Sequence, residues 1–73
     1  MHTSPTSHLR AARLKKRLTQ DAFASRIGVT KAAVSAWENH QSNPEASRIA
    51  SIDDALRPHL NLRAYLRELA QAA

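Results

Sequence analysis

The spacing of apolar residues along this chain predicts helices and no strands. Apolar positions recur three and four residues apart, whereas no run alternates between apolar and polar residues as a half-buried strand does. The clearest stripe lies near the C-terminus, where four apolar residues stand at i, i+3, i+4 and i+7: Leu62, Tyr65, Leu66 and Leu69. The fold class that this pattern predicts is all-α, a compact bundle of about five helices in a single domain over residues 1–73.

The first helix has two candidate starts. Ser4 followed by Pro5 offers an N-cap and a proline at the first helical position, and Ser7 is the alternative cap. The helix is predicted to end near residue 16. Four residues share its inward face, the last through its aliphatic stem: Leu9, Ala12, Arg13 and Lys16. A guanidinium on an inward face needs a carboxylate partner, so Arg13 predicts an ion pair.

Residues 20–39 predict two short helices joined by a tight turn. Thr19 and Thr30 are N-caps for the two helices, and Gly28 can adopt the left-handed conformation that ends the first. Ala24 supplies the small residue that is needed where the two helices cross. The inward positions of the unit are all apolar: Phe23, Ile27, Val29, Val34 and Trp37. Every position that a helix-turn-helix constrains therefore holds the required type of residue.

Two further helices complete the predicted bundle. The third helix ends at Asn39 and His40, and Pro44 opens a fourth helix that Pro58 ends or closely follows. Three inner positions of the fourth helix follow helical spacing: Ile49, Ile52 and Leu56. The last helix covers about residues 59–71. Its apolar stripe covers the core, pairs with a second copy of the chain, or does both.

The positive charge of the chain lies in its N-terminal part. Residues 1–30 hold six Lys or Arg and one Asp, whereas residues 31–73 hold five residues of each sign, so the first part carries the whole net charge of +5. A basic part beside a neutral one indicates a polyanionic partner, most often nucleic acid. A solvated face that keeps the protein soluble explains the charge about equally well.

Composition excludes several classes of protein. The chain has no cysteine, which rules out disulfides and thiolate metal sites. The first ten residues contain no apolar core of a secretory signal, and no window is apolar enough to span a membrane, so we expect a cytoplasmic protein. The adjacent Asp53 and Asp54 point in different directions on a helix, and no catalytic triad is evident, so no enzyme is expected. The histidines lack ligand spacing, so no metal or cofactor is expected: His2, His8, His40 and His59.

The segment LTQDAFASRIGVTKAAVSAWEN, followed by a short polar loop, Pro44 and residues 49–56, resembles the lambda-repressor and Cro-like (XRE-type) helix-turn-helix family. The resemblance covers roughly residues 9–56. It implies a compact bundle of about five helices, in agreement with the apolar pattern. It also implies that Arg13 pairs with Glu38, which links the first helix to the end of the third.

The resemblance further implies that the third helix lies in the major groove of double-stranded DNA, with its N-terminal residues against base edges. Its outward positions hold five residues: Thr30, Lys31, Ala32, Ser35 and Ala36. Lys31 can donate to guanine O6 and N7 or to a phosphate, and the alanines can contact a thymine methyl group or serve helix propensity alone. Few of these side chains hydrogen-bond a base, so recognition is expected to depend also on DNA shape and backbone contacts.

Contacts to the DNA backbone are expected around this helix. The family's counterpart of Gln20 bonds a phosphate and braces the recognition helix, and the free N–H groups at that helix start favour an anion. Asn39 matches a family position that contacts phosphate, with helix capping as its alternative or additional role. Three further residues are assigned to backbone contacts by position: Gln41 and Ser42 in the following loop, and Arg10 on the first helix.

Three residues depart from the family pattern. Arg17 and His40 stand where the family usually has glycine, and each costs about 1 kcal/mol if its backbone is left-handed, although His tolerates that conformation better than most residues. Asp53 replaces a small apolar residue, so the fourth helix is expected to be rotated or locally wetter. These departures concern stability and loop geometry more than function.

The function predicted is a sequence-specific transcriptional regulator, bacterial or phage-encoded, that is similar to phage Cro or repressor proteins and acts by promoter occlusion. A homodimer on a palindromic operator is expected, with residues 62, 65, 66 and 69 of the C-terminal stripe as its interface. The alternative is the antitoxin of a toxin–antitoxin pair, whose last helix would bind the toxin. A third reading is a protein-interaction module that has kept the fold and lost DNA binding.

Overall fold

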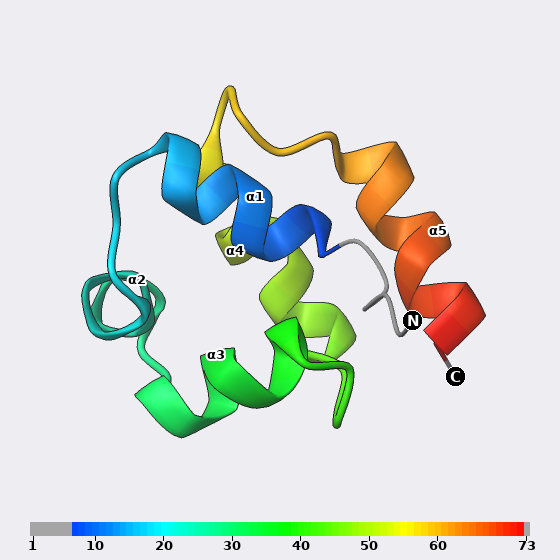
Figure 1. Ribbon diagram of the computed structural model, residues 1–73, viewed down its shortest axis with the longest axis horizontal. Helices are drawn as coiled ribbons and strands as arrows, with labels where there is room; N and C mark the ends of the chain where they lie inside the picture. Colours follow the sequence, from blue (N-terminus) through cyan, green and yellow to red (C-terminus); the bar gives the residue numbers. More distant parts are fainter. Residues whose placement is uncertain (1–6, 73) are drawn as a thin grey trace, which may run out of the picture.

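The computed structural model describes residues 7–72, and this part of the chain consists of helices joined by short turns (Figure 1). The five helices are α1 (His8–Lys15), α2 (Gln20–Ile27), α3 (Lys31–Glu38), α4 (Ala46–Leu56) and α5 (Leu62–Ala72). In Figure 1, α2 is seen nearly end-on beside α3, α1 crosses above them, and α5 lies at the side of α1. The prediction of an all-α bundle of about five helices is confirmed.

Side-chain caps define the starts of the first three helices. Ser7 Oγ accepts from the backbone N–H of Arg10 at 3.1 Å, so Ser7 is the N-cap of α1. The hydroxyls of Thr19 and Thr30 accept in the same way at the starts of α2 and α3, at 3.0 Å and 3.1 Å. Such caps satisfy N–H groups that have no partner within the helix. The other start considered, at residues 4 and 5, lies outside the described residues.

The starts of the last two helices differ from the prediction. α4 begins at Ala46 with Glu45 as its N-cap, so Pro44 lies before the helix and does not open it. Pro44 is buried, which indicates that it packs against the core while the chain turns toward α4. α5 begins at Leu62 and not near residue 59, because Asn61 Oδ1 caps it by accepting from the backbone N–H of residue 64 at 3.1 Å. The turn before it buries Leu60, which is 8 % exposed.

One hydrophobic core joins all five helices. Its buried members come from every helix and from the turn before α5: Leu9, Ala12, Phe23, Ala24, Ile27, Val34, Trp37, Ile52, Ala55, Leu56, Leu60 and Tyr65. The predicted inner faces of α1, α2 and α3 are thus correct. In α4, Ile52 and Leu56 are fully buried, whereas Ile49 is partly buried against the core.

The C-terminal stripe belongs largely to this core. Tyr65 is 0 % exposed, and Leu62 and Leu69 pack against the buried cluster. Leu66 is 45 % exposed. Tyr65 is therefore a core residue in this structure, and the predicted dimer interface stays a prediction. An amphipathic helix must bury its apolar stripe, and α5 packs this stripe against α1.

Three helices end at a residue with a left-handed backbone. The φ angles are 60° at Arg17, 79° at Gly28 and 60° at His40. After each of them, the next backbone N–H bonds back to a carbonyl in the last turn of the helix: Leu18 to Arg13 at 3.1 Å, Val29 to Ala24 at 2.9 Å, and Gln41 to Ala36 at 2.9 Å. This is the Schellman pattern of helix termination. Arg17 and His40 therefore adopt the conformation that glycine would adopt without strain.

Charged side chains bond to backbone carbonyl groups at the ends of α4 and α2. Lys16 Nζ donates to the carbonyl oxygen of Arg57 at 2.6 Å, just past α4, and Arg48 donates to the carbonyl oxygen of Ile27 at 3.1 Å, at the end of α2. Asp53 accepts from the guanidinium of Arg57 at 3.0 Å, one turn along α4. That pair keeps the unexpected carboxylate of Asp53 at the edge of the core without moving Ile52 out of it.

Candidate nucleic-acid interface

The pairing of α2 with α3 is built on apolar contacts. Phe23, Ala24 and Ile27 of α2 and Val34 and Trp37 of α3 are all buried. Small Ala24 is 2 % exposed, as expected where two helix backbones come close. The two helices are joined by residues 28–30, which begin with the left-handed backbone of Gly28. The unit therefore has the form of a helix-turn-helix.

The outward side of α3 is most open at its N-terminal end. Thr30, Lys31 and Ala32 are exposed, whereas Ser35 and Ala36, one turn later, are half-buried. We call these five residues the recognition surface. The hydroxyl of Thr30 accepts the capping bond from residue 33, which leaves its O–H donor and one lone pair for a ligand. Lys31 thus supplies the positive charge of this surface.

The turn after α3 continues this exposed side. Asn39 is the C-cap, and its Nδ2 lies 3.4 Å from Ser35 Oγ, so the capping role and an exposed amide coexist. Gln41 and Ser42 are exposed, and their backbone N–H groups both bond to the carbonyl oxygen of Ala36, at 2.9 Å and 3.4 Å. The backbone of the turn is therefore satisfied internally, and the polar side chains point to solvent.

A buried network underneath holds the three helices of this region together. Arg13 of α1 donates from Nε to Glu38 Oε2 at 2.6 Å and from Nη2 to Oε1 at 3.1 Å, so the ion pair implied by the family resemblance is present in bidentate form. Both residues are 6 % exposed. A third N–H of Arg13 donates to the carbonyl oxygen of Leu18 at 2.7 Å, which ties the pair to the segment before α2.

Gln20 also belongs to this network, which the sequence had not indicated. Its Nε2 donates to Glu38 Oε1 at 3.1 Å, so the first residue of α2 is bonded to the last residue of α3. A side-chain amide carries two N–H donors, and the second one remains for a phosphate oxygen. The bracing role expected of Gln20 therefore has a defined atom as its target, and the phosphate role is compatible with it. The resemblance located Gln20, but it did not reveal this partner.

Arg10, the remaining predicted contact, is exposed on α1. Its backbone N–H is taken by the Ser7 cap, and its guanidinium has no hydrogen bond or ion pair to any residue from 7 to 72. The structure does not bring Arg10 into contact with the recognition surface. Its assignment to the DNA backbone therefore stays a prediction from charge.

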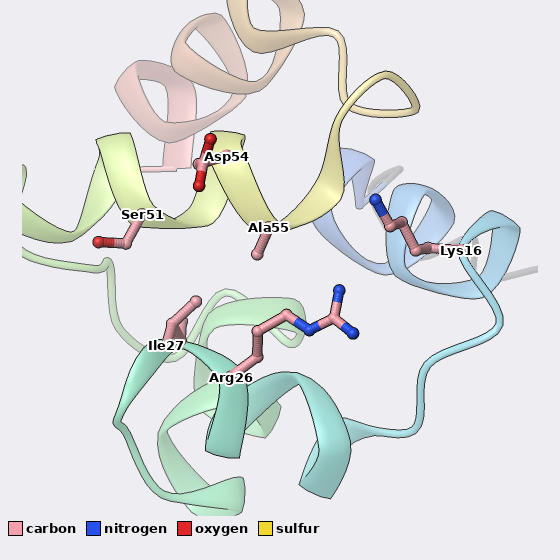
Figure 2. A pocket seen from close by; sticks show the side chains of 6 residues that line it. All are labelled: Lys16, Arg26, Ile27, Ser51, Asp54 and Ala55. Atoms are coloured by element: carbon pink, nitrogen blue, oxygen red, sulfur yellow. The ribbon is translucent and has the colours of Figure 1, made fainter.

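A polar pocket of about 320 Å³ lies between α4 and the C-terminal end of α2. Figure 2 shows Arg26 reaching from α2 into the gap between α2 and α4, with Lys16 at the end of α1 and Asp54 and Ser51 on α4. The lining carries charges of both signs, so it presents no uniformly positive site for an anion. Among the described residues, no cluster of His, Asp or Glu has an arrangement suited to a metal ion. None of the helices described is long and apolar enough to cross a membrane.

Comparison with known proteins identifies one family. A family model described as helix-turn-helix matches residues 9–58, which is more than half of the chain. The match begins in α1 and ends just past α4, so it contains the recognition surface, the turn after α3 and the buried network around Glu38. No curated protein and no solved structure matches the chain.

Proposed function

The chain belongs to the XRE-type, lambda-repressor-like helix-turn-helix family of DNA-binding transcriptional regulators, and we propose that it acts as a repressor that occludes a promoter by binding a specific operator. The observation that carries this proposal is the exposed N-terminal end of α3, with Lys31 at its centre, held from behind by the Arg13–Glu38–Gln20 network. A rigidly mounted helix end of this kind suits insertion into a major groove.

On the operator, α3 lies in the major groove and Lys31 donates to guanine O6 and N7 or to a flanking phosphate. Ala32, which is exposed, contacts a thymine methyl group. The second N–H of Gln20 and the side chains of Asn39, Gln41 and Ser42 bond phosphates on either side of the groove. Because base-reading groups are few, these backbone contacts and the net charge of +5 supply much of the affinity.

Two copies on a palindromic site would double the small number of base contacts. Leu66, which is 45 % exposed on α5, remains as the apolar residue of the C-terminal stripe that a second copy could cover. We therefore centre the proposed dimer contact on Leu66, with the outer edges of Leu62 and Leu69 beside it. Sedimentation of wild type and Leu66→Gln tests this, since a polar residue there should weaken self-association without disturbing the buried Tyr65. A strictly monomeric wild type with a non-palindromic site would reject the dimer.

The second candidate is an antitoxin that binds its own operator and a toxin. It is favoured by α5, which lies outside the family-matched residues 9–58 and presents the exposed Leu66. Purification from the native host separates the two functions, because an antitoxin copurifies with a small partner protein in a fixed ratio. A Cro-like regulator is isolated alone or as its own dimer.

The DNA-binding proposal is tested by selecting bound sequences from a random duplex library. We expect one palindromic motif, and an affinity for it that falls steeply as salt rises. Lys31→Ala should weaken binding to the selected duplex by roughly tenfold and relax the preference at one position of each half-site. Arg63→Ala, which removes one positive charge from α5, is the matched control and should leave that preference intact.

Each outcome has a distinct meaning. If Lys31→Ala weakens binding to all DNA sequences equally, Lys31 is a phosphate contact and other groups read the bases. If the wild type selects no motif and its binding does not depend on salt, the chain is not a DNA-binding regulator, and the protein-interaction module becomes the better account.

A further inference from the structure

A second, partly buried carboxylate lies outside the network described above. Glu68 of α5 has a side chain that is 9 % exposed, and its carboxylate contacts three nitrogen atoms. Oε1 lies 2.8 Å from the backbone nitrogen of His8 and 2.6 Å from its ring Nδ1, and Oε2 lies 2.9 Å from His40 Nε2. We call these three residues, His8, His40 and Glu68, the Glu68 clasp. It fastens α5 to the start of α1 and to the turn after α3.

The two arms of the clasp contact different structural elements. His8 is the first residue of α1, so Glu68 satisfies one of the free N–H groups of that helix end and places negative charge at its positive pole. His40 is the left-handed residue within the turn after α3, with φ at 60°. A non-glycine residue in this conformation is strained by about 1 kcal/mol or more. The bond from its ring to Glu68 offsets that strain.

The comparison with Arg17 shows what is special about His40. Both residues have φ at 60°, and both are followed by the same backbone bond to the preceding helix. Arg17 is exposed, and its side chain has no hydrogen bond to any other residue that the structure describes. The side chain of His40 is 15 % exposed and is held by Glu68. Of these two turns, the one held from α5 is the one that carries the proposed phosphate contacts.

We propose that Glu68 is a positioning residue for DNA binding: through His40, it holds the turn after α3 in the left-handed form that presents Asn39, Gln41 and Ser42 to the DNA backbone. The inference rests on the proposed function, because these three residues are contacts only if DNA is the ligand. Glu68 and His8 lie outside the family-matched residues 9–58, so a residue of α5 positions a turn of the helix-turn-helix unit. Anything that moves α5 then changes the DNA-contacting turn.

The first test needs no DNA. In Glu68→Ala, the turn loses its tether, so the Gln41 N–H, which bonds to Ala36, should exchange with solvent about fivefold faster. The Leu18 N–H, which closes the equivalent turn after Arg17, is the control within the same molecule and should change only as much as global stability does. In His40→Gly, glycine adopts the left-handed conformation without strain, so the protection of Gln41 should be kept.

The second test measures affinity for the duplex that the wild type selects from random DNA. Glu68→Ala should bind it about fivefold more weakly, whereas His40→Gly should bind like the wild type. The double variant Glu68→Ala with His40→Gly should recover the affinity. Its melting temperature should stay low, because the backbone N–H of His8 at the start of α1 still lacks its hydrogen bond to Glu68. His8→Ala, which removes only the other ring of the clasp, should lower stability and leave DNA affinity unchanged. Should Glu68→Ala fail to fold, Glu68→Gln takes its place in both tests.

These measurements separate the positioning role from its premise. Faster exchange at Gln41 with no DNA binding by the wild type would overturn the proposed function while leaving the tether intact. DNA binding that is sensitive to Lys31→Ala but not to Glu68→Ala would overturn the positioning role alone. If the double variant does not recover the affinity, Glu68 acts only by holding α5 in place, and the inference is wrong.

Discussion

Glu38 and Glu68 are carboxylates that each join three segments of the chain, but Glu38 is buried and Glu68 is partly buried, and they differ in partners and position. The side chain of Glu38 is 2 % exposed and is paired with Arg13 and Gln20, all within residues 9–58. Glu68 is paired with two histidines and lies in α5, outside those residues. The first carboxylate holds the helix-turn-helix itself together, and the second attaches to it a helix that the family match does not include.

The hydroxyl of Tyr65 lies close enough to both carboxylates to be affected by their charges. Burial raises the pKa of its hydroxyl, and the negative charges of Glu68 and Glu38 raise that pKa further. The hydroxyl is nevertheless buried without a hydrogen-bond partner among residues 7–72. The ring of Tyr65 therefore fills part of the core, while its polar atom contributes nothing that offsets its loss of water.

The largest loss of stability is expected from breaking the Arg13–Glu38–Gln20 network. Glu38→Gln leaves the buried guanidinium of Arg13 without a charge partner, which should cost about 3 kcal/mol and lower the melting temperature by more than about 10 °C. Glu45→Gln, at an exposed carboxylate whose side chain makes no capping bond, is the matched control and should change little. Thermal unfolding followed by circular dichroism measures both. An unchanged melting temperature in Glu38→Gln would mean that the ion pair contributes nothing.

Breaking the Glu68 clasp should lower the stability less, and by an amount that depends on pH. Burial alone would raise the pKa of the Glu68 carboxyl, but the backbone and ring N–H groups of His8 and the ring of His40 outweigh it, so its pKa lies below the usual 4.5. A carboxyl with a lowered pKa stabilises the folded state above its unfolded pKa, and this contribution is lost as pH falls through the folded value. Glu68→Gln, which cannot ionise at this site, should therefore be less stable than the wild type at neutral pH, by about 1–2 kcal/mol.

That difference should shrink as the pH falls below 4.5, where the wild-type carboxyl becomes protonated and resembles the amide. Urea unfolding of both proteins between neutral pH and acid conditions measures it. A difference that stayed constant across this range would show that the charge of Glu68 is not what holds the clasp.

The smallest change in stability is expected from removing the hydroxyl of Tyr65. Tyr65→Phe removes the buried hydroxyl that has no partner and keeps the ring, so it should stabilise the protein by about 1 kcal/mol. The measurement is the same urea unfolding at neutral pH. A loss of stability would contradict the structure, because it would show that the hydroxyl makes a bond that links the Glu38 and Glu68 networks.

Local chemistry determined much of the fold before any tertiary contact was known. Thr19, Gly28 and Thr30 specify where two helices begin and end, because capping and left-handed turns depend on a few neighbouring residues. The inward apolar positions of α2 and α3 follow from helical spacing for the same reason. The pairing of Arg13 with Glu38 was available only through the family resemblance, and the structure contains it.

Only the tertiary structure decided the rest. Glu68 and His8 are 60 residues apart, and nothing in the neighbourhood of either one indicates that α5 would bring them within 2.6 Å. The stripe containing Tyr65 and Leu66 has the same spacing whether it covers a core or a second copy, so packing alone assigns Tyr65 to the interior and leaves Leu66 outside. Helical periodicity says which residues share a face, but which other helix that face meets depends on the arrangement of the whole bundle.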